Sequence, residues 1–156
     1  MLGTRQIYNR TKCDVDVIFV LDESSSVNSE NFEKSKSFLS ALVGRLNVDS
    51  RHTRVGLVTF STNVDPKEAF NLNAHFSVAS VQSAISSLDY SMGITHTAAA
   101  LRYVRQKMLT PAAGDRAEVP NVVFVMTDGK SNKEPHQTKV CTRAGTAHLK
   151  PKFWDF

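Results

Sequence analysis

Two apolar segments, each ending in an aspartate, most constrain what this chain can fold into. The first runs from Val15 to Leu21 and continues into "DESSS", and the second lies in "NVVFVMTDG", residues 121–129. Both are short and rich in β-branched residues, which is typical of strands buried on both faces of a parallel sheet. Because the carboxyl ends of such strands meet at one sheet edge, we expect Asp22 and Asp128 at the same edge.

Helical and strand-like patterns alternate along most of the chain. Apolar residues at helical spacing predict three helices: one capped by Asn28 or Ser29, one over residues 78–88, and one that begins in "GITHT", residues 93–97. Further strands are expected over residues 53–61 and 64–72. The latter is expected at a sheet edge, because its Pro66 lacks an amide hydrogen. This alternation predicts an α/β fold with a largely parallel sheet.

Length and composition indicate one domain with a real core. The chain has 156 residues, of which 41% are hydrophobic and 22% charged. We expect an N-terminal segment over residues 1–12, a domain over residues 13–132, and a tail over residues 133–156 that lacks any helical stripe or strand-like run. The net charge of +4 is too small and scattered to favour nucleic acid. No apolar stretch approaches the roughly 18 residues that span a bilayer, so membrane insertion is not expected.

Two features near the N-terminus favour an extracellular protein. Residues 9–11, "NRT", form a glycosylation sequon, and Cys13 lies two residues beyond it. Sequons also arise by chance, and Cys13 with Cys141 is too few for a disulfide framework. The first residues lack the apolar core of a secretory signal. We therefore expect a secreted protein whose leader lies outside this chain.

Oxygen-bearing side chains gather where the predicted strands and one helix meet that sheet edge. Asp22, Ser24 and Ser26 have D-x-S-x-S spacing, Thr95 lies at a helix start, and Asp128 follows the last strand. Thr97 completes a T-x-T pair with Thr95. Carboxylates and hydroxyls converging at one place suit a hard divalent cation such as Mg²⁺, which takes six oxygens and keeps some water.

Each of these residues also has a simpler interpretation. The three serines and Thr95 could cap helices, and Asp128 before Gly129 is a common turn pair. The combination of two acids ending two strands with both hydroxyl motifs favours the metal site over these separate roles.

Four blocks of the sequence together resemble the von Willebrand factor type A domain. They are "DVIFVLDESSSV", "RVGLVTFST", "GITHTAAAL" and "NVVFVMTDGKSN", in the order in which the family has them. The resemblance implies a Rossmann-like, mostly parallel sheet with one antiparallel edge strand and helices on both faces. It implies Mg²⁺ or Mn²⁺ held directly or through water by Asp22, Ser24, Ser26, Thr95 and Asp128. It also implies a partner carboxylate from an extracellular-matrix or cell-surface protein, such as a collagen.

The chain departs from the family pattern in two places. Glu23 and Ser25 stand where the family commonly has glycine, and we expect both to be bystanders, with Glu23 adding negative charge near the rim of the site. The alternative is that Glu23 itself takes a coordination position. After "TDG" the last family strands and helix are not recognisable, so we expect an incomplete domain with an open sheet edge at residues 122–126. The family's disulfide cannot be carried over, because Cys141 lies in the divergent tail.

Three functions remain open at this stage. The first is a metal-dependent adhesion module without enzymatic activity. The second is a matrix scaffold in which the metal site is dispensable. The third is a Mg²⁺-dependent phosphotransferase, which is disfavoured because Ser24 stands where that chemistry needs a second aspartate. Neither a Walker loop nor a nucleophile elbow is present in the sequence.

Overall fold

The apolar segment near the start of the chain forms the central strand of the sheet. β1 (Val15–Asp22) pairs in parallel with β2 (Thr53–Phe60) on one side and with β3 (Asn121–Met126) on the other. The structure is a computed structural model and describes residues 14–129, 141–142 and 145–146. The predicted α/β fold with a parallel sheet is confirmed.

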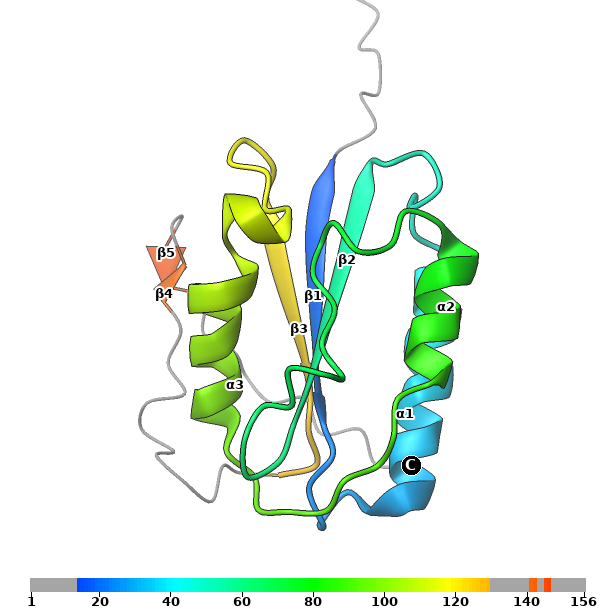
Figure 1. Cartoon of the computed structure of the whole chain (residues 1–156), viewed down its shortest axis with the longest axis vertical. Coiled ribbons are helices and arrows are strands. Elements are labelled where there is room, and N and C mark those ends of the chain that lie inside the picture. The colour runs from blue at the N-terminus through cyan, green and yellow to red at the C-terminus, as the bar shows by residue number, and fades with distance from the viewer. Residues whose placement is uncertain (1–13, 130–140, 143–144, 147–156) are drawn as a thin grey trace, which may run out of the picture.

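Helices cover both faces of this sheet (Figure 1). α1 (Asn28–Val43) and α2 (Val78–Ser86) lie together on one face, and α3 (Thr97–Tyr103) lies on the other. α3 runs into a short π-helix, Val104–Met108, and a 3₁₀ turn follows at Pro111–Ala113. The three helices occupy the regions where the spacing of apolar residues predicted them.

Side chains of β1 divide between two apolar clusters, one on each face. Val17, Phe19 and Leu21 pack with buried residues of α1 and α2, whereas Ile18 and Val20 pack with residues of α3 and the π-helix. This alternation is the two-residue period of a strand whose faces are both covered. It fixes the register of β1 and therefore the place where the strand ends.

Side chains accept backbone amides at the starts of α1 and α2. The Asn28 Oδ1 accepts a hydrogen bond from the Asn31 amide at 3.0 Å, whereas Val27, the N-cap residue of α1, makes no side-chain cap. Asn28 has a φ of +59°, a conformation that asparagine tolerates better than most residues. Ser77 caps α2 in a reciprocal arrangement with Ser80. The serines of the "DESSS" stretch therefore do not cap α1 with their side chains.

The strand predicted over residues 64–72 is wrong. The segment meets β2 only in two isolated antiparallel bridges, one from Val64 to Phe60 and one from Phe70 to Leu57. The bridge from Phe70 has two backbone hydrogen bonds of 2.9 Å. The Asp65 carboxylate instead accepts the Lys67 amide at 2.8 Å, which folds the chain into a turn around Pro66. A local turn therefore replaces most of the expected edge strand.

The last strand is less buried than its composition predicts. β3 lies at an edge of the described three-stranded sheet, and Val122 is 46% exposed. Beyond it, β4 (Cys141–Thr142) and β5 (Gly145–Thr146) form a small antiparallel hairpin. The pattern of the tail did not predict this hairpin, because two-residue strands are too short to show a period. The sequon and Cys13 lie outside the described residues, and no described helix is long and apolar enough to cross a membrane.

An ion pair joins the amino-terminal end of the sheet to the loop before β3. Asp16 is fully buried in β1, and its Oδ1 accepts hydrogen bonds from Arg116 Nε at 2.9 Å and Nη2 at 2.6 Å. The same guanidinium donates to the carbonyls of Val15 and His52. Arg116 therefore neutralises a charge within the central strand and fastens the starts of β1 and β2 together.

We expect Arg116→Ala to lower the free energy of unfolding by about 3 kcal/mol, because the buried Asp16 carboxylate loses its cation. Chemical denaturation monitored by circular dichroism measures the change. The control is Lys34→Ala, which removes an ion pair to Glu30 whose side chains are 52% and 79% exposed. That loss should stay within about 0.5 kcal/mol. Equal effects of the two variants would contradict the role of Arg116.

Candidate metal site

The five side chains predicted to bind a metal come together at the carboxyl end of the sheet. Asp22 is the last residue of β1, and Ser24 and Ser26 follow it before α1 begins. Asp128 lies two residues beyond β3, and Thr95 lies two residues before α3. Parallel pairing of β1 with β3 brings the first and last of these segments together.

Four of these side chains form a continuous row of hydrogen bonds. Thr95 Oγ1 donates to Ser24 Oγ at 3.1 Å, and the hydroxyls of Ser24 and Ser26 lie 3.1 Å apart. Ser26 Oγ then donates to Asp128 Oδ1 at 3.0 Å. Residues more than seventy positions apart in the chain thus present their oxygens to one another.

Asp22 lies beside this row and is held in place through both carboxylate oxygens. Its Oδ1 accepts the Ser24 amide at 2.9 Å, and its Oδ2 accepts the Thr127 hydroxyl at 2.6 Å. Burial raises the pKa of Asp22, and the nearby Asp128 charge acts in the same direction, against the hydrogen bonds from Thr127 and Ser24. Asp22 is therefore a buried acid whose ionised form is disfavoured by its surroundings.

Helix capping does not account for these residues. The backbone N-cap of α3 is His96, not Thr95, and the cap makes no side-chain hydrogen bond to the helix. Thr97 is the first residue of α3 and is buried. α1 has no side-chain hydrogen bond at its N-cap, so the capping alternative is wrong for Ser24 and Ser26. Thr95 lies one residue before the N-cap of α3, and its hydroxyl belongs to the row described above.

The loop that carries Thr95 is fastened to the loop after β1. Within residues 89–96, here called the Thr95 loop, Gly93 exchanges two hydrogen bonds with Ser25: its carbonyl accepts the Ser25 amide at 2.9 Å, and its amide donates to Ser25 Oγ at 3.2 Å. Tyr90 donates its phenolic hydrogen to the Ser24 carbonyl at 3.1 Å. Ser25, expected to be a bystander, therefore positions the neighbouring loop.

Glu23 is not at the surface of the site but beneath it. The residue is 1% exposed, and burial raises its pKa most, with Asp65 and Glu68 adding to the effect and hydrogen bonds from Ser91 opposing it. Its Oε2 has no hydrogen-bond partner among the described residues. The expectation that Glu23 is a bystander at the rim is wrong in its placement, because the carboxyl group lies against the Thr95 loop.

Thr127 and Gly93 are site residues that the sequence reasoning missed. Thr127 stands in "MTDG" directly before Asp128, so its place at the end of the strand could be predicted from the sequence. Its contact with Asp22 could not, because that contact depends on the pairing of β1 with β3. Gly93 is needed because a Cβ there would lie 2.6 Å from Thr62 Oγ1 and 2.9 Å from Ser61 Oγ. The close approach of the Ser61 and Thr62 side chains to the Gly93 backbone, rather than a turn, explains this glycine.

The site has fewer charged donors than a site built from acids alone. Among the described residues no three His, Cys, Asp or Glu side chains gather closely enough to hold a metal ion by themselves. Any cation here would depend on hydroxyl and water oxygens in addition to two carboxylates. That donor set suits Mg²⁺ and related hard ions, which accept neutral oxygens and retain water.

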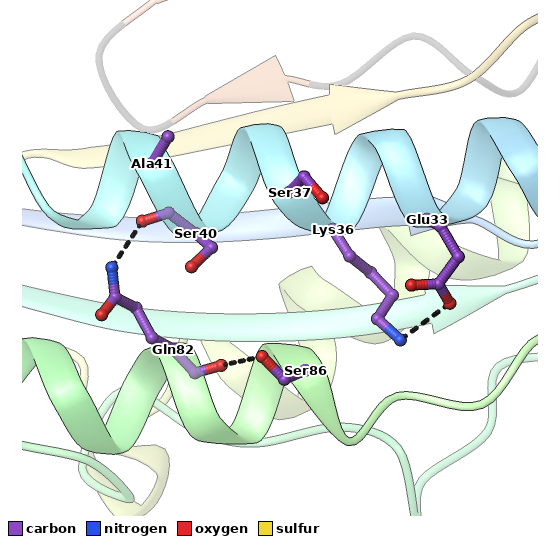
Figure 2. Close-up of a pocket in the computed structure, with 7 residues that line it drawn as sticks. All are labelled: Glu33, Lys36, Ser37, Ser40, Ala41, Gln82 and Ser86. Carbon is purple, nitrogen blue, oxygen red and sulfur yellow. Dashed lines mark hydrogen bonds and ion pairs between the residues drawn. The ribbon is translucent and has the colours of Figure 1, made fainter.

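A groove elsewhere, between α1 and α2, has a volume of about 430 Å³ (Figure 2). Its polar lining is largely satisfied internally: Lys36 Nζ donates to Glu33 Oε1 at 3.0 Å, and Gln82 Nε2 donates to the Ser40 carbonyl at 2.9 Å. Lys36 also donates to the Leu88 carbonyl at 2.8 Å. These contacts tie the two helices together and leave the groove without a cluster of unmatched polar groups.

Comparison with known proteins agrees with the fold. The sequence profile of the von Willebrand factor type A domain matches residues 16–148, and the chain belongs to this family. It is 41% identical to the mouse collagen alpha-4(VI) chain over 121 residues, which is 76% of this chain and 5% of that protein. It is 38% identical to mouse matrilin-1 over 137 residues, which is 86% of this chain and 27% of that protein.

Solved structures of a mussel protein resemble the chain as well. Proximal thread matrix protein 1 from the mussel byssus superposes with a TM-score of 0.70 at 31% identity, over 77% of this chain and 32% of that one. A further structure of the same protein, described as having a zinc-occupied MIDAS motif, gives a TM-score of 0.68 at 30% identity, over 78% of this chain and 30% of that one. The chain thus spans about a third or less of these relatives.

We expect Gly93→Ala to lower the free energy of unfolding by about 1–3 kcal/mol, because the added methyl group forces the Thr95 loop away from Ser61 and Thr62. Urea denaturation measures the change. Gly129→Ala is the matched control, since a Cβ at Gly129 meets nothing within 4 Å. Its effect should stay within about 0.5 kcal/mol. If Gly93→Ala is as mild as the control, the loop is not held as closely as described.

Proposed function

We propose that this chain is a divalent-metal-dependent adhesion module that binds an acidic side chain of an extracellular-matrix or cell-surface protein. The observation that carries the proposal is the row of hydrogen bonds from Thr95 through Ser24 and Ser26 to Asp128, with Asp22 beside it. Asp22, Ser24, Ser26, Thr95 and Asp128 would hold the ion directly or through water.

The electrostatics of Asp22 support a cation at this place. The carboxyl group is buried, and the causes of its raised pKa include the Asp128 charge but no cationic side chain from the described part of the chain. A divalent cation would stabilise both carboxylates at once. The hydrogen bonds from Ser24 and Thr127 already orient Asp22, so ion binding would require little rearrangement of that side chain.

The neutral hydroxyls set what the bound ion can do. Ser24, Ser26 and Thr95 supply oxygens without charge, so two carboxylates alone would balance a divalent ion. When bound, the ion supplies a Lewis-acidic position that accepts a carboxylate oxygen from a partner protein. The oxygen donors favour Mg²⁺ or Mn²⁺ over softer metals. The zinc described in one mussel structure makes Zn²⁺ a necessary comparison in any binding test.

The relatives support an extracellular role. They are a collagen chain, a matrilin and a thread matrix protein, and we propose that this chain, too, acts outside the cell as part of such a matrix. A collagen is one candidate partner. We propose no chemical step for the site: the hydroxyls of Ser24 and Ser26 bond to each other and to Thr95 and Asp128, which the proposal uses as metal ligands.

Saturating Mg²⁺ or Mn²⁺ should raise the melting midpoint of the 156-residue chain relative to EDTA. An ion present at a hundred times its dissociation constant adds about 2.7 kcal/mol, which corresponds to roughly 5–10 °C. Asp22→Asn should abolish most of this rise, because it removes the charge while an amide still fills the space and bonds to Thr127. Differential scanning calorimetry with and without each ion, Zn²⁺ included, measures both.

Asp89→Asn is the charge-matched control for this experiment, since Asp89 is exposed and lies outside the proposed ligand set. Its metal-induced rise should equal that of the unmodified chain. If the chain melts cooperatively and none of the three ions changes its midpoint, the metal is removed from the proposal. A rise with metal, combined with partner binding that survives Asp22→Asn unchanged, would instead favour a scaffold in which the metal site is dispensable.

The stabilisation by Mg²⁺ should shrink as the pH falls. Burial raises the pKa of Asp22 above 3.8, so in the metal-free chain this group favours folding most below pH 3.8, and that contribution is lost as the pH rises through the raised pKa. Metal binding needs the ionised carboxylate, so the stabilisation that the metal supplies grows as the pH rises. Midpoints recorded with Mg²⁺ and with EDTA should therefore converge on acidification. A gap that stays constant down to pH 3.8 would contradict this account.

A further inference from the structure

We propose that Asp128 is a modification site, which converts spontaneously to isoaspartate in the metal-free chain and is protected from this conversion by a bound divalent cation. The feature that carries the proposal is the Asp128–Gly129 pair, because no other glycine in the sequence follows an aspartate or an asparagine. The conversion itself is independent of the proposed function, whereas the protection by a cation rests on it.

The reaction joins the side chain of Asp128 to the backbone of Gly129. The Gly129 nitrogen attacks Cγ of Asp128 and loses its proton, and the bond from Cγ to a hydroxyl oxygen breaks, so one water leaves and a five-membered succinimide remains. Water then opens this ring. When the water adds to the α-carbonyl carbon, the bond from that carbon to the Gly129 nitrogen breaks, and the chain continues through Cγ as isoaspartate. One water leaves and one returns, so the mass of the chain is unchanged.

Gly129 offers little resistance to this attack. It has no Cβ to hinder the approach to its own nitrogen, and a Cβ there would meet nothing within 4 Å among the described residues. Its amide lies beyond the end of β3 at Met126, outside the ladder that joins β3 to β1. The amide donates to Thr127 Oγ1 at 3.3 Å, a long hydrogen bond that holds the nitrogen only weakly.

The Asp128 carboxyl group is open to the water that the reaction releases and consumes. Asp128 is exposed, whereas Asp22, the other acid of the site, is 1% exposed. The Asp128 Oδ1 accepts the Ser26 hydroxyl at 3.0 Å in a hydrogen bond between exposed groups. Asp22 is held through both of its oxygens and is followed by Glu23, which has a side chain to hinder its nitrogen. Of the two acids, only Asp128 combines an accessible carboxyl group with an unhindered neighbouring amide.

Isomerisation would remove one of the two carboxylates from the proposed metal site. In isoaspartate the free carboxylate is attached directly to Cα, and the backbone is longer by one methylene group. The carboxylate then no longer extends toward Ser26 as the aspartate side chain does. A cation on Asp128 opposes the first step in return, because succinimide formation consumes a carboxyl oxygen that would bind the ion.

The test stores the full, folded chain at neutral pH and one temperature, with EDTA or with saturating Mg²⁺. Trypsin then releases residues 117–130, which contain Asp128, and residues 46–51, which contain Asp49. Chromatography separates the isoaspartyl form of each peptide, and electron-transfer fragmentation identifies it. Asp49 is the internal control: it is also exposed, but its Oδ1 accepts the Val78 amide at 2.9 Å, and Ser50 after it has a Cβ.

In EDTA, isoaspartate should accumulate at Asp128 well above its level at Asp49. Mg²⁺ at a hundred times its dissociation constant leaves about one chain in a hundred without an ion, so formation at Asp128 should slow by up to about a hundredfold. Asp22→Asn, which should not hold the ion, should isomerise in Mg²⁺ as fast as in EDTA. In the chain stored with EDTA, the fraction whose melting midpoint responds to Mg²⁺ should fall as the isoaspartate content rises.

Gly129→Ala tests the chemistry itself. Gly129 is not among the described residues with a positive φ, and a Cβ there meets nothing nearby, so the variant should fold as the unmodified chain does. Its methyl group hinders the attacking nitrogen. Isoaspartate at Asp128 in EDTA should therefore fall toward the level at Asp49, while fresh protein keeps its Mg²⁺-induced rise in midpoint.

The outcomes separate the modification site from the proposed function. If isoaspartate at Asp128 in EDTA does not exceed that at Asp49, or if Gly129→Ala leaves it unchanged, the modification site is overturned. If Mg²⁺ raises the midpoint of the fresh chain but does not slow the conversion, the protection is overturned and the metal site stands. If isoaspartate forms as expected while no ion raises the midpoint, the metal-dependent function falls and the modification site stands.

Discussion

The burial of β1 on both faces is the constraint on which the rest of the structure depends. The strand pairs in parallel with β2 and β3, and its side chains alternate between two apolar clusters. A one-residue slip would move every apolar side chain to the wrong cluster, so the register is strongly fixed. Because the register is fixed, Asp22 can end the strand at only one place, and β3 must deliver Thr127 and Asp128 beside it. The candidate site is a consequence of core packing.

Two buried acids lie at opposite ends of the same strand, and only one of them is neutralised by a cationic side chain among the described residues. Asp16 near the start is paired with Arg116, which donates to it from two guanidinium nitrogens and from its backbone amide. Asp22 at the other end is held only by hydrogen bonds from Ser24 and Thr127. Hydrogen bonds orient a carboxylate but do not neutralise it, and burial accordingly raises the pKa of Asp22. The Asp16 end of the strand has its own cation and serves the structure. The Asp22 end has no cation in the described part of the chain, so an ion from solution would stabilise that end most.

How much could be predicted from sequence follows from the same packing. The places of Asp22, Ser24, Ser26 and Asp128 were predictable because they depend only on where apolar strands end. Asp16 was passed over, since its partner Arg116 is one hundred residues away and no local pattern links them. The strand over residues 64–72 failed because an Asp65 turn outweighs the apolar composition there. Thr127 and Glu23 were missed or misplaced because their roles arise from contacts between segments that the fold alone brings together.

Glu23 shows that the site is built at the expense of local stability. Its carboxyl group is buried, one oxygen has no partner among the described residues, and its pKa is raised. An unsatisfied buried polar atom costs about 1–3 kcal/mol, which an isosteric apolar residue would avoid. Its hydrogen bonds with Ser91 nevertheless anchor the Thr95 loop at one end, while Gly93 and Ser25 anchor its middle. Two anchors on one short loop hold Thr95 against Ser24 before any ligand arrives. The unfavourable burial of Glu23 is therefore best understood as part of what makes the loop rigid, and rigidity is what a weakly charged metal site with neutral hydroxyl donors most requires.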